Sequence, residues 1–91
     1  MVLSVSKKFV IKMDLATIVH EITYFCHAAG DFSSKIEIKV DNKKADAKSI
    51  INIMALGIKQ DSEIELTATG SDAQNAITRL EEILRQQAII D

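Results

Sequence analysis

The 91-residue sequence contains no proline, no tryptophan, three glycines and one cysteine. With 47% hydrophobic and 26% charged residues, so little glycine and proline excludes a linker or a disordered chain. We expect a single domain over residues 1–91, because a chain of this length builds one hydrophobic core. A lone cysteine cannot form an internal disulfide, so we predict that Cys26 packs as a small hydrophobe in a reducing compartment.

An excess of positive charge is also missing. The formal net charge is −2, from 11 Lys and Arg against 13 Asp and Glu spread along the chain. No electrostatic footprint for a phosphate backbone is visible, so nucleic acid is not an expected partner. No apolar stretch approaches the ~20 residues of a membrane span, and the N-terminus lacks the unbroken apolar run of a signal peptide. We expect a cytoplasmic protein with no membrane partner.

Alternating hydrophobicity opens the chain. Apolar residues occupy the odd positions from Leu3 to Met13, broken only by Lys7, which predicts a strand with one wet face. The period then becomes helical, with Thr17 as the predicted N-cap and Gly30 as the predicted stop. The predicted buried stripe of this first helix is Ile18, Ile22, Phe25 or Cys26, and Ala29.

The middle of the chain predicts a hairpin and a short helix. Residues 35–41 alternate strictly, and a weaker strand over 43–47 follows a tight turn. Residues 49–57 begin with Ser49, a good N-cap, and end at Gly57, so they predict a helix of about two turns. This helix is apolar on more sides than one buried stripe requires, which leaves partly in the open Ile51, Ala55 and Ile58.

A fourth strand and a long helix complete the chain. Residues 63–68 alternate again, and Ser71 with Gln74 forms a predicted capping box before the helix. Glu81 and Arg85 are spaced to form a supportive ion pair on its outer side. The predicted buried stripe is Ala73, Ala76, Ile77, Leu80, Ile83, Leu84 and Ala88.

The order of elements is therefore βαββαβα. Strands two and three form a hairpin, so the sheet cannot be all parallel. We predict an α+β fold in which helices cover one face of a sheet and the other face is wet.

A long segment, "KSIINIMALGIKQDSEIELTATGSDAQNAITRLEEIL" (residues 48–84), resembles the phosphocarrier protein HPr of the bacterial sugar phosphotransferase system. It has that family's pattern of a lysine, a serine, a short apolar helix ending in Leu-Gly, a strand, a glycine and a terminal helix. The resemblance implies an open-faced sandwich of four antiparallel strands with three helices on one face. It also implies a protein that is not an enzyme and needs no cofactor.

The family's phosphoacceptor signature is missing from the first helix. HPr proteins carry a Gly-Ile-His-Ala-Arg-Pro-like stretch whose histidine receives phosphate from enzyme I. In gapless register this stretch falls on residues 16–21, so the histidine maps to Ile18, the arginine to His20 and the proline to Glu21. The resemblance therefore implies a family member that is not an ordinary phosphoryl carrier.

His20 is the alternative phosphoacceptor. With Thr17 as N-cap, His20 is the third helical residue and points outward rather than across the open helix end, where phosphate is stabilised. Shifting the register by two residues would rotate the apolar stripe by about 200°. A metal site is not predicted either, because His20 and His27 are separated by roughly 10.5 Å of helical rise, too far to share one zinc.

Ser49 matches a second family site, the serine that HPr kinase/phosphorylase modifies in many Gram-positive members. A phosphate there would add close to two negative charges beside an exposed apolar surface, which commonly marks a docking site. Asn52 interrupts this surface where the family usually has glycine. The predicted partner-docking residues are Lys48, Ile50, Ile51, Met54, Ala55 and Ile58.

Three functional hypotheses remain open. The first is a regulatory HPr-like protein whose partners are HPr kinase/phosphorylase or a transcription regulator. The second is a diverged phosphocarrier that uses His20. The third is a small ligand-binding or RNA-binding α+β module of similar topology. RNA-binding sheets carry stacking aromatics amid positive charge, and the aromatic residues here are only Phe9, Tyr24, Phe25 and Phe32, two of them on the first predicted helix.

Overall fold

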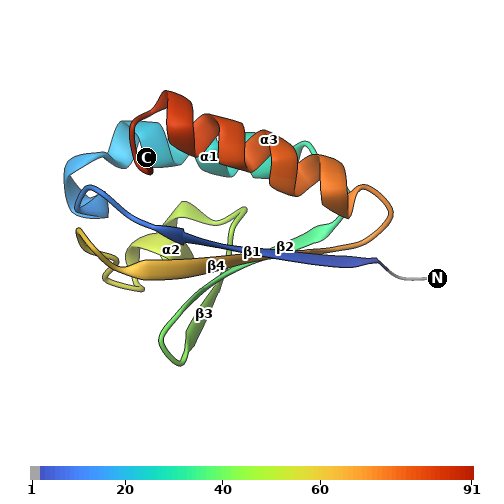
Figure 1. Ribbon diagram of the computed structural model, residues 1–91, viewed down its shortest axis with the longest axis horizontal. Helices are drawn as coiled ribbons and strands as arrows, with labels where there is room; N and C mark the ends of the chain where they lie inside the picture. Colours follow the sequence, from blue (N-terminus) through green and yellow to red (C-terminus); the bar gives the residue numbers. More distant parts are fainter. Residues whose placement is uncertain (1–2) are drawn as a thin grey trace.

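The sheet contains four antiparallel strands in the spatial order β1-β4-β2-β3 (Figure 1). A computed structural model describes residues 3–91, so the first two residues of the expected domain lie outside the described range. The strands are β1 (Ser4–Val10), β2 (Lys35–Val40), β3 (Lys43–Asp46) and β4 (Glu63–Thr69). The helices are α1 (Val19–Gly30), α2 (Ile50–Met54) and α3 (Ala73–Gln86), and a 3-10 turn, η1 (Leu15–Thr17), precedes α1.

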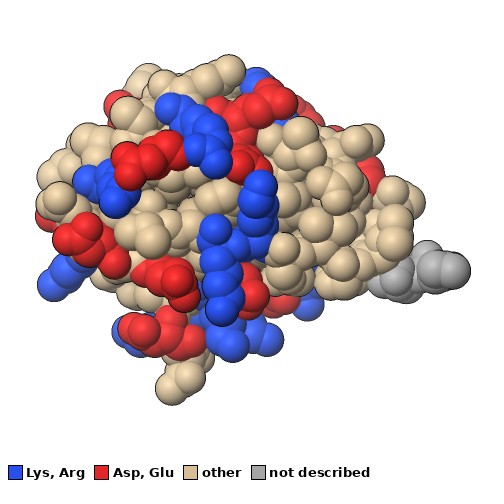
Figure 2. Space-filling view, viewed as in Figure 1, with Lys and Arg blue, Asp and Glu red and all other residues tan. Residues whose placement is uncertain are grey.

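The helices α1 and α3 lie side by side over one face of the sheet (Figure 1). Their apolar stripes meet the buried residues of the strands in one core, and the opposite sheet face carries charged and hydroxyl side chains. The predicted α+β class and the βαββαβα order are confirmed. Lys/Arg and Asp/Glu side chains are interspersed on the face drawn in Figure 2. None of the helices in residues 3–91 has the length and apolar character that a membrane crossing requires.

Lys7 interrupts the apolar side of β1 and forms an ion pair with Glu81 of α3. Its Nζ donates to Glu81 Oε1 at 2.6 Å, and Glu81 also accepts from Arg85 Nη2 at 2.7 Å. These hydrogen bonds, that of Lys7 first, lower the pKa of Glu81. The predicted pair of Glu81 and Arg85 is confirmed, and Lys7 extends it into a link between the sheet and α3.

The predicted helix starts are wrong in two places. Thr17 ends η1 and donates through its hydroxyl to the Asp14 carbonyl at 2.7 Å, while Ile18 takes the N-cap position of α1. The capping box of Ser71 and Gln74 does not form, because α3 begins at Ala73, after Asp72. In both cases a hydroxyl that fits a cap by local sequence lies outside the helix that actually forms.

The strand and helix ends also differ from expectation. β1 is shorter than the predicted strand of residues 3–13, because it leaves β4 after Val10. At the other end of the chain Ala88 is exposed with a φ of 60°, instead of closing the buried stripe of α3. The chain turns back there, so that Ile89 and Ile90 fill the core and the Ile89 carbonyl accepts from Lys12 N at 2.7 Å.

Asp72 fastens the start of α3 to the start of β2. Its carboxylate accepts from the backbone N–H of Ser33 at 2.9 Å and of Ser34 at 3.0 Å, and from both serine hydroxyls. The Ser34 hydroxyl is the largest of the causes that lower the Asp72 pKa from 3.8 to about 2. Ser34 is itself buried, so this contact satisfies a polar group inside the fold.

We expect Asp72→Asn to lower the melting temperature at neutral pH, because the amide cannot accept as many charged hydrogen bonds. The folded-state pKa is depressed, so this stabilisation is complete above pH 4 and is lost as the pH falls towards 2. The difference in melting temperature between wild type and variant should therefore shrink between about pH 4 and pH 2. A pH-independent difference, followed by circular dichroism, would contradict the role of the carboxylate charge.

Candidate docking and phosphorylation site

The N-cap position of α1 is occupied by a residue with a hydrocarbon side chain. Ile18 occupies the N-cap position with a φ of −128°, makes no side-chain cap, and is 5% exposed. The first turn of a helix leaves its backbone N–H groups without partners inside the helix. Because Ile18 is turned into the core, it offers those amides no polar side chain.

His20 lies in the first turn of α1, on the exposed side of the helix, whereas Ile18 faces the core. It is the second residue of α1, one position earlier than predicted, and it is exposed. His20 lines a surface hollow of about 340 Å³. The other lining residues are Glu21 and Tyr24 of α1, Gln86 at the end of α3, and Gln87 just after it. The structure therefore places His20 towards α3.

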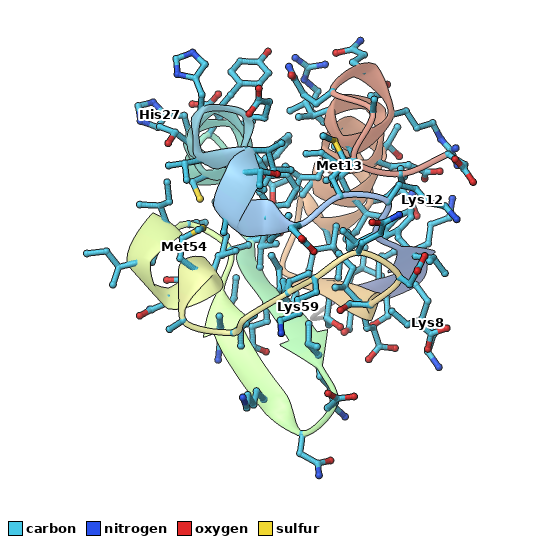
Figure 3. The ribbon with its side chains drawn as sticks, turned by 90° about the vertical axis from the view of Figure 1, so that its left-hand side faces the viewer. Lys8, Lys12, Met13, His27, Met54 and Lys59 are labelled. Atoms are coloured by element: carbon cyan, nitrogen blue, oxygen red, sulfur yellow. The ribbon has the colours of Figure 1, made fainter. Side chains whose placement is uncertain are left out.

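His27 and Cys26 lie further along α1. His27 is exposed on the outer side of the helix (Figure 3). Residues 3–91 contain no group of three or more His, Cys, Asp or Glu arranged to hold a metal ion. Cys26 is 6% exposed, and burial, together with the charge of Asp46, raises its pKa to about 11. Its thiol therefore stays protonated and packs as part of the core.

Ser49 caps α2, as the sequence predicts. Its Oγ accepts from Asn52 N at 3.3 Å, and its side chain is half-buried. Lys48 next to it is exposed, and its Nζ donates to the Phe32 carbonyl at 2.8 Å. The serine hydroxyl thus lies at the surface, between the end of β3 and the first turn of α2.

An apolar surface covers α2 and is called the α2 patch. Ile51 is 78% exposed, Ala55 is exposed, and Ile50 and Met54 are half-buried. The expectation for Ile58 is wrong: it is 4% exposed, because its carbonyl accepts from Leu15 N and holds it under η1. The α2 patch therefore consists of Ile50, Ile51, Met54 and Ala55.

A hollow of about 200 Å³ separates η1 from the end of α2. Residues 14–17 line one side, and Met54 with residues 57–59 lines the other; Figure 3 shows Met54 and Lys59 beside this turn. Asp14 connects η1 to the loop after α2, because its Oδ1 accepts a hydrogen bond from Gln60 N at 2.7 Å. Nothing in the local sequence pairs Asp14 with Gln60. The hollow adjoins the α2 patch and the start of α1, and we call these three together the α1–α2 end.

A family of known proteins and several solved structures are similar to this chain. The family described as "PTS HPr component phosphorylation site" matches residues 5–86. The histidine-containing phosphocarrier protein of Mycoplasma is 30% identical with a TM-score of 0.90, over 96% of this chain and 99% of that one. HPr of Bacillus anthracis is 33% identical with a TM-score of 0.78, over 88% and 95%. Crh, the Bacillus subtilis catabolite repression HPr, is 29% identical with a TM-score of 0.63, over 87% and 94%.

The fold is that of a small phosphocarrier-like protein, a class of phosphocarriers that are not enzymes. The chain belongs to the HPr family of the phosphotransferase system. Proteins of this family interact with phosphotransferase proteins and with HPr kinase, and they are typically cytoplasmic.

Proposed function

We propose that this HPr-family protein does not carry phosphoryl groups at the usual position and acts as a regulator switched by phosphorylation of Ser49. One observation supports this above all: the side chain of Ile18, onto which the family histidine maps in gapless register, is 5% exposed. A buried hydrocarbon has no atom that can accept a phosphoryl group. His20, the alternative acceptor, faces the hollow beside α3.

Ser49 and the α2 patch supply the regulatory half of the proposal. The serine lies beside an apolar surface that includes Ile51, 78% exposed, and such surfaces commonly dock partners. A phosphate on Ser49 would change the charge next to that surface without refolding it. Crh, which the Bacillus subtilis structure names a catabolite repression HPr, supports a partner of the transcription-regulator class.

A two-arm labelling experiment tests the proposal. One arm supplies enzyme I with labelled phosphoenolpyruvate, and the other supplies HPr kinase with labelled ATP. We expect no acid-labile phosphate in the first arm and close to one acid-stable phosphate per chain in the second, because Ile18 cannot react and Ser49 is accessible. The measurement is phosphate content with peptide mapping by mass spectrometry.

The control for the second arm is Ser49→Ala, which should remove the acid-stable label. Ser71→Ala, which changes another surface serine that caps no helix, should retain it. Stoichiometric acid-labile label on His20 of the wild type would overturn the proposal, as would label in the second arm that survives Ser49→Ala.

A further inference from the structure

A hollow lies away from the α1–α2 end, between the later half of α1 and the first half of α3. It has a volume of about 560 Å³. The smaller hollow beside His20 adjoins it, since Tyr24 lines both. His20, Tyr24 and His27 follow one face of α1, and the proposed regulatory function leaves this face without a role. We call the larger hollow the α1–α3 groove; its polar and aromatic lining residues are Tyr24, His27, Asp31, Phe32, Asn75 and Arg79.

Tyr24 and Arg79 form a bridge across the groove that leaves hydrogen-bond donors free. Arg79 Nη2 donates to the Tyr24 hydroxyl oxygen at 3.1 Å, so the hydroxyl hydrogen remains available to another acceptor. The second contact of Arg79, from Nη1 to Glu82 Oε2, is 3.4 Å long and exposed. A guanidinium carries five N–H donors, so most of those of Arg79 are not engaged.

Asn75 adds donors to the same groove. Neither Asn75 nor His27 forms a side-chain hydrogen bond with any other residue between 3 and 91. The amide of Asn75 brings two N–H donors. Asp31 is the single carboxylate that lines the groove. The unengaged N–H groups of Arg79 and Asn75 favour a ligand that carries acceptor oxygens.

The planar fork of an arginine matches an oxyanion with two or more equivalent oxygens, above all phosphate. The exposed pair with Glu82 is of the kind that contributes little, so a phosphate can replace it at small cost. Asp31 accepts hydrogen bonds and repels a second anion, which suits hydroxyl groups beside the phosphate. The rings of Tyr24 and Phe32 offer apolar faces to the rest of such a ligand.

We propose that the α1–α3 groove binds a small phosphate ester that carries hydroxyl groups, with the phosphate on Arg79 and Tyr24 and the hydroxyls towards Asp31 and Asn75. Sugar phosphates and nucleotides share this chemistry. None of the groove residues belongs to α2, η1 or the hollow beside them. Lys48, beside Ser49, does donate to the carbonyl of Phe32, so the two regions share a contact. The groove variants at Tyr24 and Arg79 and the variant at Ser49 change different residues, so either function can fail in an experiment without the other.

The test is a titration of the full chain, uniformly labelled with ¹⁵N, followed by amide chemical shifts. The probes are glucose 6-phosphate and AMP, their unphosphorylated counterparts glucose and adenosine, and inorganic phosphate. We expect saturable shifts at Tyr24, His27, Asn75 and Arg79 with at least one ester, and binding at least about tenfold weaker for its unphosphorylated counterpart and for phosphate alone. The ester that binds more tightly identifies the source of the ligand.

Arg79→Gln should weaken ester binding about tenfold or more, because it removes a charged donor. Arg85→Gln is the matched control: it removes the same charge from α3, but Arg85 contacts Glu81 and Asp91 outside the groove. Tyr24→Phe, which keeps the ring, tests the same contact should Arg79→Gln fail to fold. The proposal is overturned if neither ester shifts the groove amides, if inorganic phosphate binds as well as the esters, or if Arg85→Gln weakens binding as much as Arg79→Gln.

Discussion

Gly70→Ala is expected to lower the free energy of unfolding by roughly 2–5 kcal/mol. Gly70 has a φ of 149°, in the region that residues with a Cβ rarely adopt. A Cβ built there would lie 2.6 Å from Ser34 Oγ and 2.9 Å from Ser34 Cα. The Cα cannot move aside without displacing the start of β2, and Asp72 holds the Ser34 hydroxyl in place. Urea unfolding followed by circular dichroism measures the loss.

Gly30→Ala is the matched control for this prediction. Gly30 ends α1 without a positive φ, and no atom outside the helix lies within 4 Å of a Cβ added there. Alanine at this position should stabilise the protein by about 0.5–1 kcal/mol, because it reduces the backbone entropy of the unfolded chain. If the two substitutions changed stability by similar amounts, the close approach of Gly70 to Ser34 would not be the cause.

Local sequence patterns predict the buried faces of the helices and strands, but not the contacts between distant parts of the chain. The buried faces of α3 and β2 follow from their hydrophobic periods, because periodicity reports which side of an element faces the core. The clasp between Asp72 and Ser34 joins residues 38 positions apart, and no local pattern predicts it. Ser71 fits the rule for a helix cap better than its neighbour does, yet the long-range contacts of Asp72 fix where α3 begins.

In the candidate site, too, the sequence predicts the exposure of some residues but not of those covered by distant parts of the chain. Amphipathic counting along α2 predicts that Ile51 and Ala55 are exposed, and both are. It fails for Ile58, because that residue follows the helix and is covered by η1, which lies more than 40 positions earlier in the chain. The sequence alone does not predict the α1–α3 groove either. Tyr24 and Arg79 meet only because α1 and α3 lie side by side on the sheet.

Ile18→His combined with His20→Arg is expected to give a variant that takes close to one phosphoryl group per molecule from enzyme I, whereas the proposed function predicts none for the wild type. Ile18 holds the N-cap position of α1, where the first-turn amides and the helix dipole favour an anion. An imidazole there is polar and would turn from the core towards those amides. Arginine at position 20 restores the positive charge that the family signature carries beside its histidine.

The double substitution also removes a buried isoleucine, so we expect it to cost about 1–3 kcal/mol of stability. Thermal unfolding must therefore show that the variant is folded at the labelling temperature. His20→Arg alone is the matched control and should remain unlabelled, because it supplies the arginine without a phosphoacceptor. Acid-labile phosphate on the wild type that disappears in His20→Asn would show that the hydrocarbon at position 18 does not prevent phosphoryl transfer.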